Sequence, residues 1–545
     1  MRVLLIGAIL IASSAQAQQA ANGSQQTATG SQQIAKGIVY EDANGNGKKD
    51  RREKAVAGVA VSNGKAVVLT DAKGNYRLPI GDDAIVFVVK PAGYKLPLQE
   101  NKLPKFYYNH KPAGSPAAMK YKGVDPTGPL PKSIDFALLP GGESDVYTAL
   151  VFGDPQPLNE TELGYFDRGI VDEVSGIVDG VRGLDDKANS IQQVAFGISL
   201  GDLVWDDLNL QPKYIEVMKK IGLPWHNTMG NHDMNYEATS DSLSDETFER
   251  NFGPATYSFN YGQAHFIIFD DILYPDPRDQ KGYWGGFRKD QLDFMENDLK
   301  TVPKDKLVIC AFHIPLQQYA DSYNLTDRQR YFDLLQPFAN TLTLSAHTHL
   351  QRNDLYTEKD GWHGAKPHHE YNAGTTCGDW HSGELNEIGV PVSTMRDGTP
   401  KGYAFLHING NQYTINYKAA GHPAAYQIKL FAPKLAQQKR NSAGIYANFF
   451  MGRPDSKLEI RIDNGDWAPM VWVDDADPLY LDALHKFDFT EVPLTGRRPS
   501  NPENCTHLWR FAIPNNLSPG QHQAEVRATD LFGKTYTEKI SFGIN

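Results

Sequence analysis

Short apolar runs alternate with helical patterns in the middle of the chain, between about residues 145 and 415. "VYTALVF", "VAFGISL", "HFIIFDD", "KLVICAF" and "TLTLS" have the length and composition of buried strands. Between them, apolar residues recur at spacings of three and four, over residues 166–181 and again over 214–221. This alternation predicts an α/β domain built in layers.

The regions on either side have a different pattern. Residues 36–142 contain β-branched runs such as "AVVLTD" and "AIVFVVK", separated by Gly, Asn and Asp turns. Residues 419–545 alternate apolar with polar positions in "SKLEIRID" and "QAEVRATD". We therefore expect an N-terminal β-sandwich, a central α/β domain over 143–418 and a C-terminal β-sandwich, in keeping with a length of 545 residues.

The first residues have the pattern of a signal peptide. Arg2 precedes an apolar run at residues 3–12, and "AQA" at 15–17 has the form of a cleavage site. Residues 18–35 are rich in Gln, Ser, Gly and Ala and predict a flexible leader. The apolar run is short for a transmembrane helix, and no later run is long enough. We expect an exported protein, periplasmic or secreted.

Charge and cysteine content narrow the possible partners and scaffolds. A net charge of −11 argues against a nucleic-acid groove. The 3 cysteines can form at most one pair, so the chain is no disulfide scaffold.

Polar clusters follow the strand-like runs of the central domain. Taken singly, an Asp there is most often a turn or cap residue, and a lone His is a surface or core residue. In chain order, however, carboxylate, amide and imidazole side chains recur at positions where ligands bind α/β sheets. Such a mixed set suits Mn, Fe or Zn. The clusters are Asp154 with Gln156, Asp202, Asn231 with His232 and Asp233, His313, and His347 with His349.

This ordered set resembles the calcineurin-like metallophosphoesterase superfamily, whose pattern is D-x-H, G-D, G-N-H-[DE], H and G-H-x-H. The stretches "YYNHKPAGSPAAMKYKGVDPTGPLPKSIDFAL" and "RDGTPKGYAF" are similar to those of bacterial exported members with β domains on both sides of the phosphoesterase domain. The resemblance implies a four-layer α-β-β-α sandwich around two metal ions.

The resemblance also implies a role for each matching residue. Asp202 would bridge both metals. Asp154 and His349 would bind the first metal. The second would be bound by Asn231, His313 and His347. His232 would not bind metal; it would lie near the leaving group and donate a proton or a charged hydrogen bond to it.

Gln156 departs from the family pattern, which has His at this position as a ligand of the first metal. A glutamine carbonyl can bind a hard cation but is a weaker donor than imidazole. Three outcomes follow: weak binding by Gln156, replacement by water or another residue, or a largely empty first site. We favour a working enzyme with an altered first site.

The long segment after "HTH" contains candidates for the substrate pocket. His363, Trp380 and His381 would line it, or would be scattered over a surface loop. Asp397 in "DGTPKGY" is a pocket candidate as well, although a turn is the commoner role for this pattern. Asp206 would support the site or, more commonly for such a residue, be a solvated acid.

A separate segment at residues 42–53, "DANGNGKKDRRE", fits the EF-hand calcium loop formula. Gly47 is at the required turn, and the flanks have the pattern of strands. We favour a structural calcium site over a plain Asn-Gly hairpin. Its ligands would be Asp42, Asn44, Asn46, the carbonyl of Lys48, Asp50 and Glu53.

These patterns lead to two functional hypotheses. The first is an exported phosphoesterase that uses a water activated by two metals, with nucleotides, phosphosugars or envelope headgroups as substrates. The second is a non-catalytic binding or adhesion protein that keeps a metal for structure. Gln156 is the feature that favours the second hypothesis, and the intact His232 opposes it.

Overall fold

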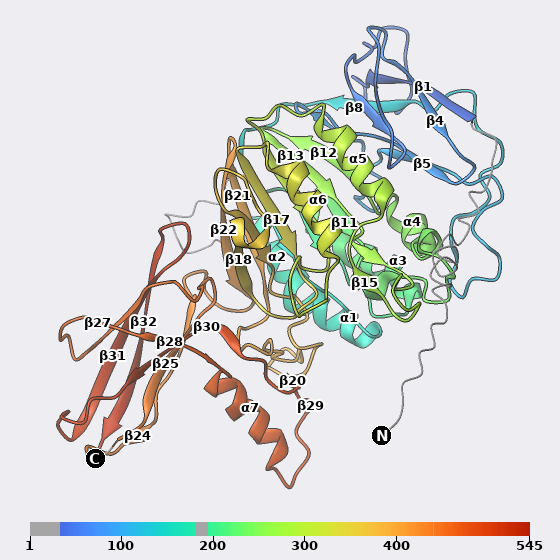
Figure 1. The fold of residues 1–545 in the computed structure, drawn as a ribbon. Helices are drawn as coiled ribbons and strands as arrows, with labels where there is room; N and C mark the ends of the chain where they lie inside the picture. The colour runs from blue at the N-terminus through green and yellow to red at the C-terminus, as the bar shows by residue number, and fades with distance from the viewer. Residues whose placement is uncertain (1–32, 181–193, 440) are drawn as a thin grey trace, which may run out of the picture.

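In the computed structural model, which describes residues 33–180, 194–439 and 441–545, two β-sandwiches lie on opposite sides of a central layered domain (Figure 1). The predicted signal peptide and most of the predicted leader lie outside the described residues. The last leader residues, 33–35, do not belong to a leader: they begin strand β1 (Gln33–Glu41), where Ala35 is fully buried opposite Leu78.

The first central sheet has the strand order β11-β10-β9-β21-β22. Three of its strands are parallel and are all buried: β9 (Val146–Phe152), β10 (Val194–Leu200) and β11 (Trp225–Thr228). Two later strands extend it by antiparallel pairing: β21 (Gly402–Asn409) and β22 (Gln412–Ala419). The near-continuous apolar runs of the sequence are typical of such buried parallel strands.

The second central sheet has the order β12-β13-β16-β17-β19-β18. Its strands β13, β16, β17 and β19 are parallel, and the outer two pair antiparallel. The bounds are β12 (Tyr257–Tyr261), β13 (Ala264–Ile268), β16 (Leu307–Ala311), β17 (Asn340–Ser345), β18 (Arg352–Tyr356) and β19 (His368–Asn372).

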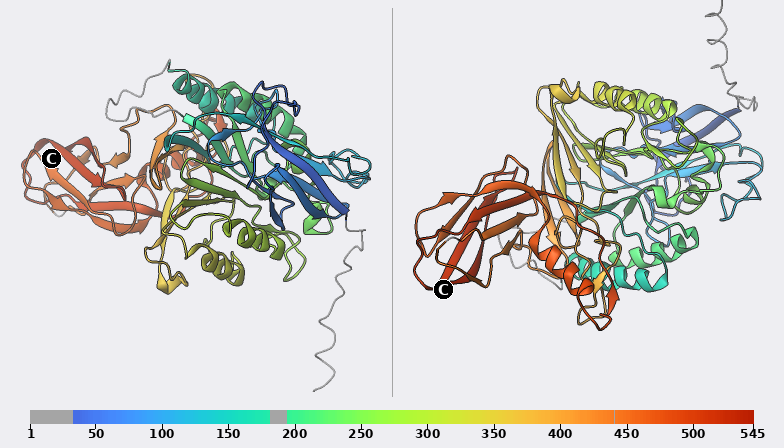
Figure 2. Two further views of the ribbon diagram at one scale, coloured as in Figure 1. Left: turned by 90° about the horizontal axis from the view of Figure 1, so that it is seen from above. Right: turned by 60° about the horizontal axis from the view of Figure 1, so that its bottom comes forward.

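Helices cover the outer face of each sheet, as the view from above shows (Figure 2). Phe166 packs edge-on against Phe152 of the first sheet, and Tyr331 hydrogen-bonds Thr343 of the second. Between the sheets, Phe196 packs against Phe266. The result is the predicted α-β-β-α order. The helices are α1 (Glu160–Phe166), the π-helical turn η1 (Asp167–Val171), α2 (Asp172–Val178), α3 (Gln211–Met218), α4 (Glu246–Phe252), α5 (Lys289–Leu299) and α6 (Leu325–Leu335).

The N-terminal sandwich consists of the sheets β4-β1-β8-β6 and β3-β2-β5-β7. Lys111 attaches it to the central domain by ion pairs with Glu246 and Glu249 of α4. Its other strands are β2 (Ala60–Ser62), β3 (Val67–Leu69), β4 (Asn75–Ile80), β5 (Ala84–Val88), β6 (Tyr94–Lys95), β7 (Tyr107–His110) and β8 (Phe136–Pro140).

The C-terminal sandwich consists of the sheets β23-β25-β30-β28 and β24-β32-β31-β26-β27. Between β28 and β30 the chain leaves the sandwich, forms α7 (Pro478–Asp488) and β29 (Gly496–Arg497), and pairs with β20 (Gly383–Glu384) of the central domain (Figure 1). The sandwich strands are β23 (Ile428–Phe431), β24 (Leu435–Ala436), β25 (Gly444–Phe449), β26 (Leu458–Ile462), β27 (Ala468–Pro469), β28 (Val471–Asp475), β30 (Cys505–Ala512), β31 (Gly520–Thr529) and β32 (Thr535–Ile544).

Within the described residues, no helix is both long and apolar enough to span a membrane. The three cysteines, Cys310, Cys377 and Cys505, are all buried thiols.

Candidate active site

The polar clusters found in the sequence meet where parallel strands of both sheets end. Because these strands are parallel within each sheet and the two sheets are stacked, their carboxyl ends meet in one place. The side chains concerned are Asp154 and Gln156 after β9, Asp202 after β10, Asn231 and His232 after β11, His313 after β16, and His347 and His349 after β17.

His313 is at the centre of one half of the cluster. Its Nε2 atom lies 3.1 Å from Asn231 Oδ1, 3.3 Å from Asp202 Oδ2 and 3.1 Å from His347 Nδ1. Ligand atoms of Asp202, His313 and His347 all lie within 4.8 Å of one another. One carboxylate, one amide oxygen and two imidazole nitrogens therefore converge on a single point, a set of donors that suits a divalent metal ion.

The other half of the cluster contains Asp154, His349 and Gln156. His349 Nε2 lies 3.2 Å from Asp154 Oδ2, and Gln156 Nε2 donates a hydrogen bond to Asp202 Oδ2 over 3.1 Å. Asp154 Oδ2 and Gln156 Oε1 are buried and have no hydrogen-bond partner among the described residues. Buried oxygens of this kind are costly unless a cation or donor joins them, so both halves fit a metal ion.

The backbone is strained at these same residues. Positive φ values, rare outside glycine, occur at Asp154 (25°), Gln156 (40°), Asp202 (48°), His347 (68°) and His349 (53°). Strain of this kind costs about 1–3 kcal/mol per residue and concentrates at functional sites. The tight turns aim the side chains at the point where the two sheets meet.

The glycines of the "GD" and "GNHD" motifs have a steric role in these turns. A Cβ on Gly230 would lie 2.0 Å from the backbone nitrogen of Asp202. A Cβ on Gly201 would lie 2.6 Å from His313 Nδ1. Only glycine lets these loops approach closely enough for their ligands to share a metal.

Neighbouring buried groups fix which imidazole nitrogen faces the centre. His313 Nδ1–H donates to Leu200 O over 2.8 Å, and His349 Nδ1–H donates to Gly378 O over 2.7 Å. In both residues the other ring nitrogen, Nε2, faces the centre of the cluster. Asp271, which the sequence did not single out, accepts the backbone N–H of His313 and so fixes that loop.

Burial and neighbouring charges shift the pKa values of the cluster in different directions. Burial opposes ionisation of Asp202, but the charges of His313 and His232 more than compensate and lower its pKa. Burial raises the pKa of Asp154 to about 7 and lowers those of His347 to about 3 and His349 to about 4. His347 and His349 are therefore neutral near pH 7, as metal ligands must be. Burial opposes the charge of His313, but Asp202 and Asp154 raise its pKa to about 10.

His232 lies beside the cluster and is paired with Asp206. His232 Nδ1 lies 2.7 Å from Asp206 Oδ1, and its backbone N–H donates to Asp202 Oδ1. Burial opposes the charged imidazole, but Asp202 and Asp206 raise the pKa of His232. Of the two roles considered for Asp206, support of the site fits better than that of a solvated acid. Its side chain is half exposed, but it bonds His232.

Three family models match successive parts of the chain. Residues 147–351 match calcineurin-like phosphoesterase, residues 43–125 the N terminal of calcineurin-like phosphoesterase, and residues 370–536 the C terminal of calcineurin-like phosphoesterase. The chain belongs to the calcineurin-like phosphoesterases. This confirms the resemblance found in the sequence. The chain is thus a metal-dependent hydrolase of phosphoester bonds, which leaves the non-catalytic alternative unsupported.

Among solved structures, the phosphoesterase is similar to the purple acid phosphatase PPD1 from seeds of yellow lupin (Lupinus luteus). The two are 12% identical, the similarity covers 67% of each chain, and the TM-score is 0.35. No curated protein matches the chain.

Two of the residues predicted for the substrate pocket lie next to the metal ligands. The ring of Trp380 lies 4.3 Å from that of His349. His381 lies behind the turn that carries the first ligands, and its Nε2–H donates to Pro155 O over 3.0 Å. The sequence missed Trp205 and Tyr283, whose rings lie 5.3 Å from His232 and 6.2 Å from His347. Single aromatic residues in loops give no sequence signal that separates them from packing residues.

The two other pocket candidates lie elsewhere, which corrects the sequence prediction. His363 is exposed and precedes β19, whose other end, at Asn372, is the one near the site. Asp397 is buried between the central and C-terminal domains. It accepts the backbone N–H groups of Gln351 and Thr399 and lies 3.2 Å from His507 Nε2. Asp397 is therefore in a turn, as the commoner interpretation expected, and it also joins two domains, which the sequence did not predict.

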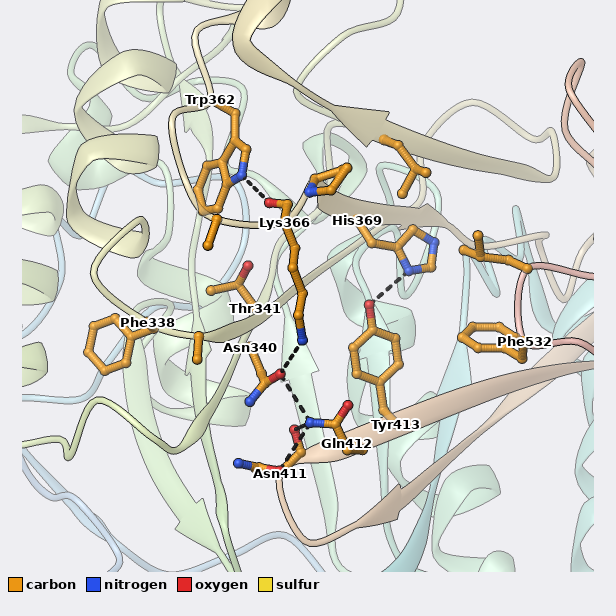
Figure 3. Close-up of a pocket in the computed structure, with 15 residues that line it drawn as sticks. Phe338, Asn340, Thr341, Trp362, Lys366, His369, Asn411, Gln412, Tyr413 and Phe532 are labelled. Atoms are coloured by element: carbon orange, nitrogen blue, oxygen red, sulfur yellow. Dashed lines mark hydrogen bonds between the residues drawn. The ribbon is translucent and has the colours of Figure 1, made fainter.

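A cavity of about 280 Å³ lies at the end of the second sheet away from the ligands (Figure 3). His369 of β19 hydrogen-bonds Tyr413 of β22 there, and Phe532 of the C-terminal sandwich closes one side. His369 thus belongs to a domain junction rather than to the site, whereas its neighbour His368 hydrogen-bonds Thr341 and Thr343 inside the second sheet.

The predicted calcium loop forms a compact turn in the N-terminal sandwich. Asp42, almost fully buried, accepts the backbone N–H groups of Asn46 and Gly47. Asp50 Oδ2 accepts from the amides of Asn44 and Asn46, and the Glu53 carboxylate accepts from the backbone of Asp50 and Ala43. The Lys48 backbone N–H donates to Asn46 Oδ1. The predicted ligand side chains therefore hydrogen-bond to one another and to the backbone of the loop.

Proposed function

We propose that this protein is an exported phosphoesterase that hydrolyses small phosphomonoesters or phosphodiesters at a centre of two transition metals, Mn, Fe or Zn. The convergence of Asp202, His313 and His347 within 4.8 Å, beside the buried Asp154 and His349, carries this proposal. Asp202 would bridge the metals, with Asp154, His349 and Gln156 on one side. The other side would have Asn231, His313 and His347.

The chain's own residues provide orientation and proton transfer. When bound, the metals neutralise the phosphoryl oxygens and lower the pKa of a water so that it can act as nucleophile. His232, with its raised pKa, holds a proton beside the centre and transfers it to the leaving oxygen. Asp206 holds the His232 ring in place through Nδ1. The strained turns keep the ligands preorganised, so little reorganisation is needed during the reaction.

Metal-dependent turnover tests this proposal. Mature protein is stripped of metal and resupplied separately with Mn, Zn, Fe, Mg and Ca, with p-nitrophenyl phosphate and bis-p-nitrophenyl phosphate as substrates. We expect a transition metal to restore turnover, and His232→Ala or Asn231→Ala to abolish it. Folded protein with no turnover under any metal would contradict the proposal.

The natural substrate is proposed to be a nucleotide, a phosphosugar or an envelope headgroup outside the cytoplasm. Support for export comes from the signal-peptide pattern of residues 1–17. Expression of the full chain followed by mass spectrometry of the N-terminus tests it. We expect cleavage after Ala17 and recovery outside the cytoplasm, whereas an intact N-terminus on cytoplasmic protein would contradict export.

The loop at residues 42–53 is proposed to bind one structural calcium ion. Its support is the alignment of ligand positions in the sequence and the compact turn in which Asp42, Asp50 and Glu53 accept hydrogen bonds from the loop's own N–H groups. Calcium should raise the Tm of the full chain, and Asp50→Ala should remove this increase. An equal increase in the variant would show that calcium acts elsewhere.

A further inference from the structure

Two tryptophan rings lie together beside the metal ligands. Trp205 is 5.3 Å from the His232 ring, Trp380 is 4.3 Å from the His349 ring, and the two indoles are 6.2 Å from each other. They come from loops 175 residues apart in the chain, so only the fold brings them together. We call Trp205 and Trp380 the indole pair.

The indole pair is not part of the hydrophobic core. Both rings are partly exposed, whereas Trp225, Trp362 and Trp509 are 1–3% exposed. The exposed part of these two indoles does not stabilise the fold, because its apolar area stays in contact with water. Such a surface is suited to a ligand that covers it.

Trp380 is held in its place before any substrate arrives. Its backbone has a φ of 46°, and the Arg396 guanidinium lies 5.4 Å from its ring. Arg396 in turn donates to Thr348 O, between two metal ligands, and pairs with Glu503 of the C-terminal domain over 3.0 Å. A ring fixed by such contacts loses little conformational freedom when a ligand stacks on it.

The two sides of the site differ in character. Trp205 lies on the side of His232, where the proposed function places the leaving group. On the side of the second metal are Tyr283, 6.2 Å from His347, and Tyr236, which contacts Asn231. Near the indole pair, Asp206 is negative and the charge of Arg396 is balanced by Glu503. The leaving-group side therefore offers two flat apolar rings beside the carboxylate of Asp206.

We propose that Trp205 and Trp380 form the leaving-group subsite of this phosphoesterase, selecting esters whose leaving alcohol carries a ring with an apolar face. A nucleobase stacks on indole through its π face, and a sugar ring does so through its C–H face. Acyclic alcohols lack such a face and gain nothing from the subsite. This inference rests on the proposed function, because it uses His232 to define the leaving-group side.

The test compares three primary-alcohol monoesters with the wild-type protein: glycerol 3-phosphate, glucose 6-phosphate and adenosine 5′-monophosphate. Their leaving groups are chemically alike, so differences in kcat/KM report contacts beyond the phosphate. If only bis-p-nitrophenyl phosphate is hydrolysed, the methyl diesters of the same alcohols replace them. We expect at least one ring-bearing ester to exceed the glycerol ester about tenfold, as base–aromatic stacking permits.

Variants locate this preference on the indole pair. Trp205→Leu should bring the ratio of ring-bearing to glycerol ester close to one, and Trp205→Phe should retain most of it. The matched control is Trp472→Leu on β28, a partly exposed indole of the C-terminal sandwich whose N–H donates to Thr506 O. Metal content and kcat/KM for glycerol 3-phosphate, which has no ring, are measured on every variant, so that loss of the metal centre is recognised.

The outcomes separate this inference from the proposed function. Turnover of the p-nitrophenyl esters with equal kcat/KM for all three alcohols would overturn the indole subsite and leave the phosphoesterase function intact. A preference that survives in both Trp205→Leu and Trp380→Leu would also overturn it. If only adenosine 5′-monophosphate is preferred, the ring that stacks on the indole pair is a nucleobase. If glucose 6-phosphate is preferred as well, the stacked ring is a sugar. No turnover of any ester would contradict the proposed function itself.

Discussion

His232 Nδ1 lies 2.7 Å from Asp206 Oδ1, so the proposed proton donor is held by a carboxylate from the loop that also carries Asp202. The pair fixes the ring and leaves Nε2 as the nitrogen available to a leaving group. One loop thus contains both the proposed metal ligand Asp202 and Asp206, the partner of the proton donor His232.

Asp206→Asn should lower kcat about tenfold, because the loss of a charged partner weakens and disorients the acid. The loss should be larger for alkyl esters than for p-nitrophenyl esters, since p-nitrophenolate leaves without a proton. Asp207→Asn is the matched control, because the Asp207 side chain accepts from Asn209 and an Asn side chain can accept the same bond. Equal kinetics for the two variants would show that Asp206 has no special role.

Gln156→His should increase the affinity of the first metal position about tenfold, because imidazole is a better donor than an amide. Metal content after dialysis against graded chelator measures this directly. Gln156→Leu, which removes the bond to Asp202 Oδ2, should lower metal retention. If all three proteins retained the same metal, Gln156 would lie outside the coordination sphere.

His507→Gln should destabilise the junction of the central and C-terminal domains by about 3 kcal/mol, since it leaves Asp397 buried beside a neutral partner. Burial disfavours charged His507, but Cys505 and Asp397 raise its pKa well above the ordinary value. Burial opposes the charge of Asp397, but His507 lowers its pKa.

The loss of stability caused by His507→Gln should depend on pH. A group with a raised folded pKa contributes fully below its unfolded pKa, about 6.5 for His, and loses the contribution as pH rises through its folded pKa. A carboxyl with a lowered pKa contributes above about 3.9 and loses it on acidification. The Tm difference between wild type and His507→Gln should be largest near pH 5–6 and shrink toward pH 10. A difference independent of pH would contradict the charged pair.

Lys111→Met should lower the free energy of unfolding by about 3 kcal/mol, because it leaves the fully buried Glu246 without its cation. Lys122→Met is the control, since its pair with Asp125 is exposed and such pairs contribute about 0–1 kcal/mol. Calorimetry of the full chains compares the two. Similar Tm values for both variants would show that Lys111 does not stabilise the attachment of the N-terminal sandwich.

The sequence determined the layered fold and the ligand set. Apolar runs such as "KLVICAF" became buried parallel strands, and residues 166–178 became the predicted helical segment, with Val181 outside the described residues. Polar residues placed after such runs met in space because parallel strands end at one edge. Hydrophobic periodicity and motif order are local properties, so they can be found without tertiary information.

Only the tertiary structure decided the surroundings of the ligands. Trp205 and Trp380 meet across distant loops, Asp206 turned out to bond His232, and Asp397 is buried against His507 of another domain. His363 is close to "HTH" in sequence, but it comes before β19. Because β19 runs parallel to β17, its first residues lie at the end of the sheet away from the site and its last residue, Asn372, lies near the site. Contacts between loops depend on how strands are ordered and stacked, and no spacing within the chain encodes that order.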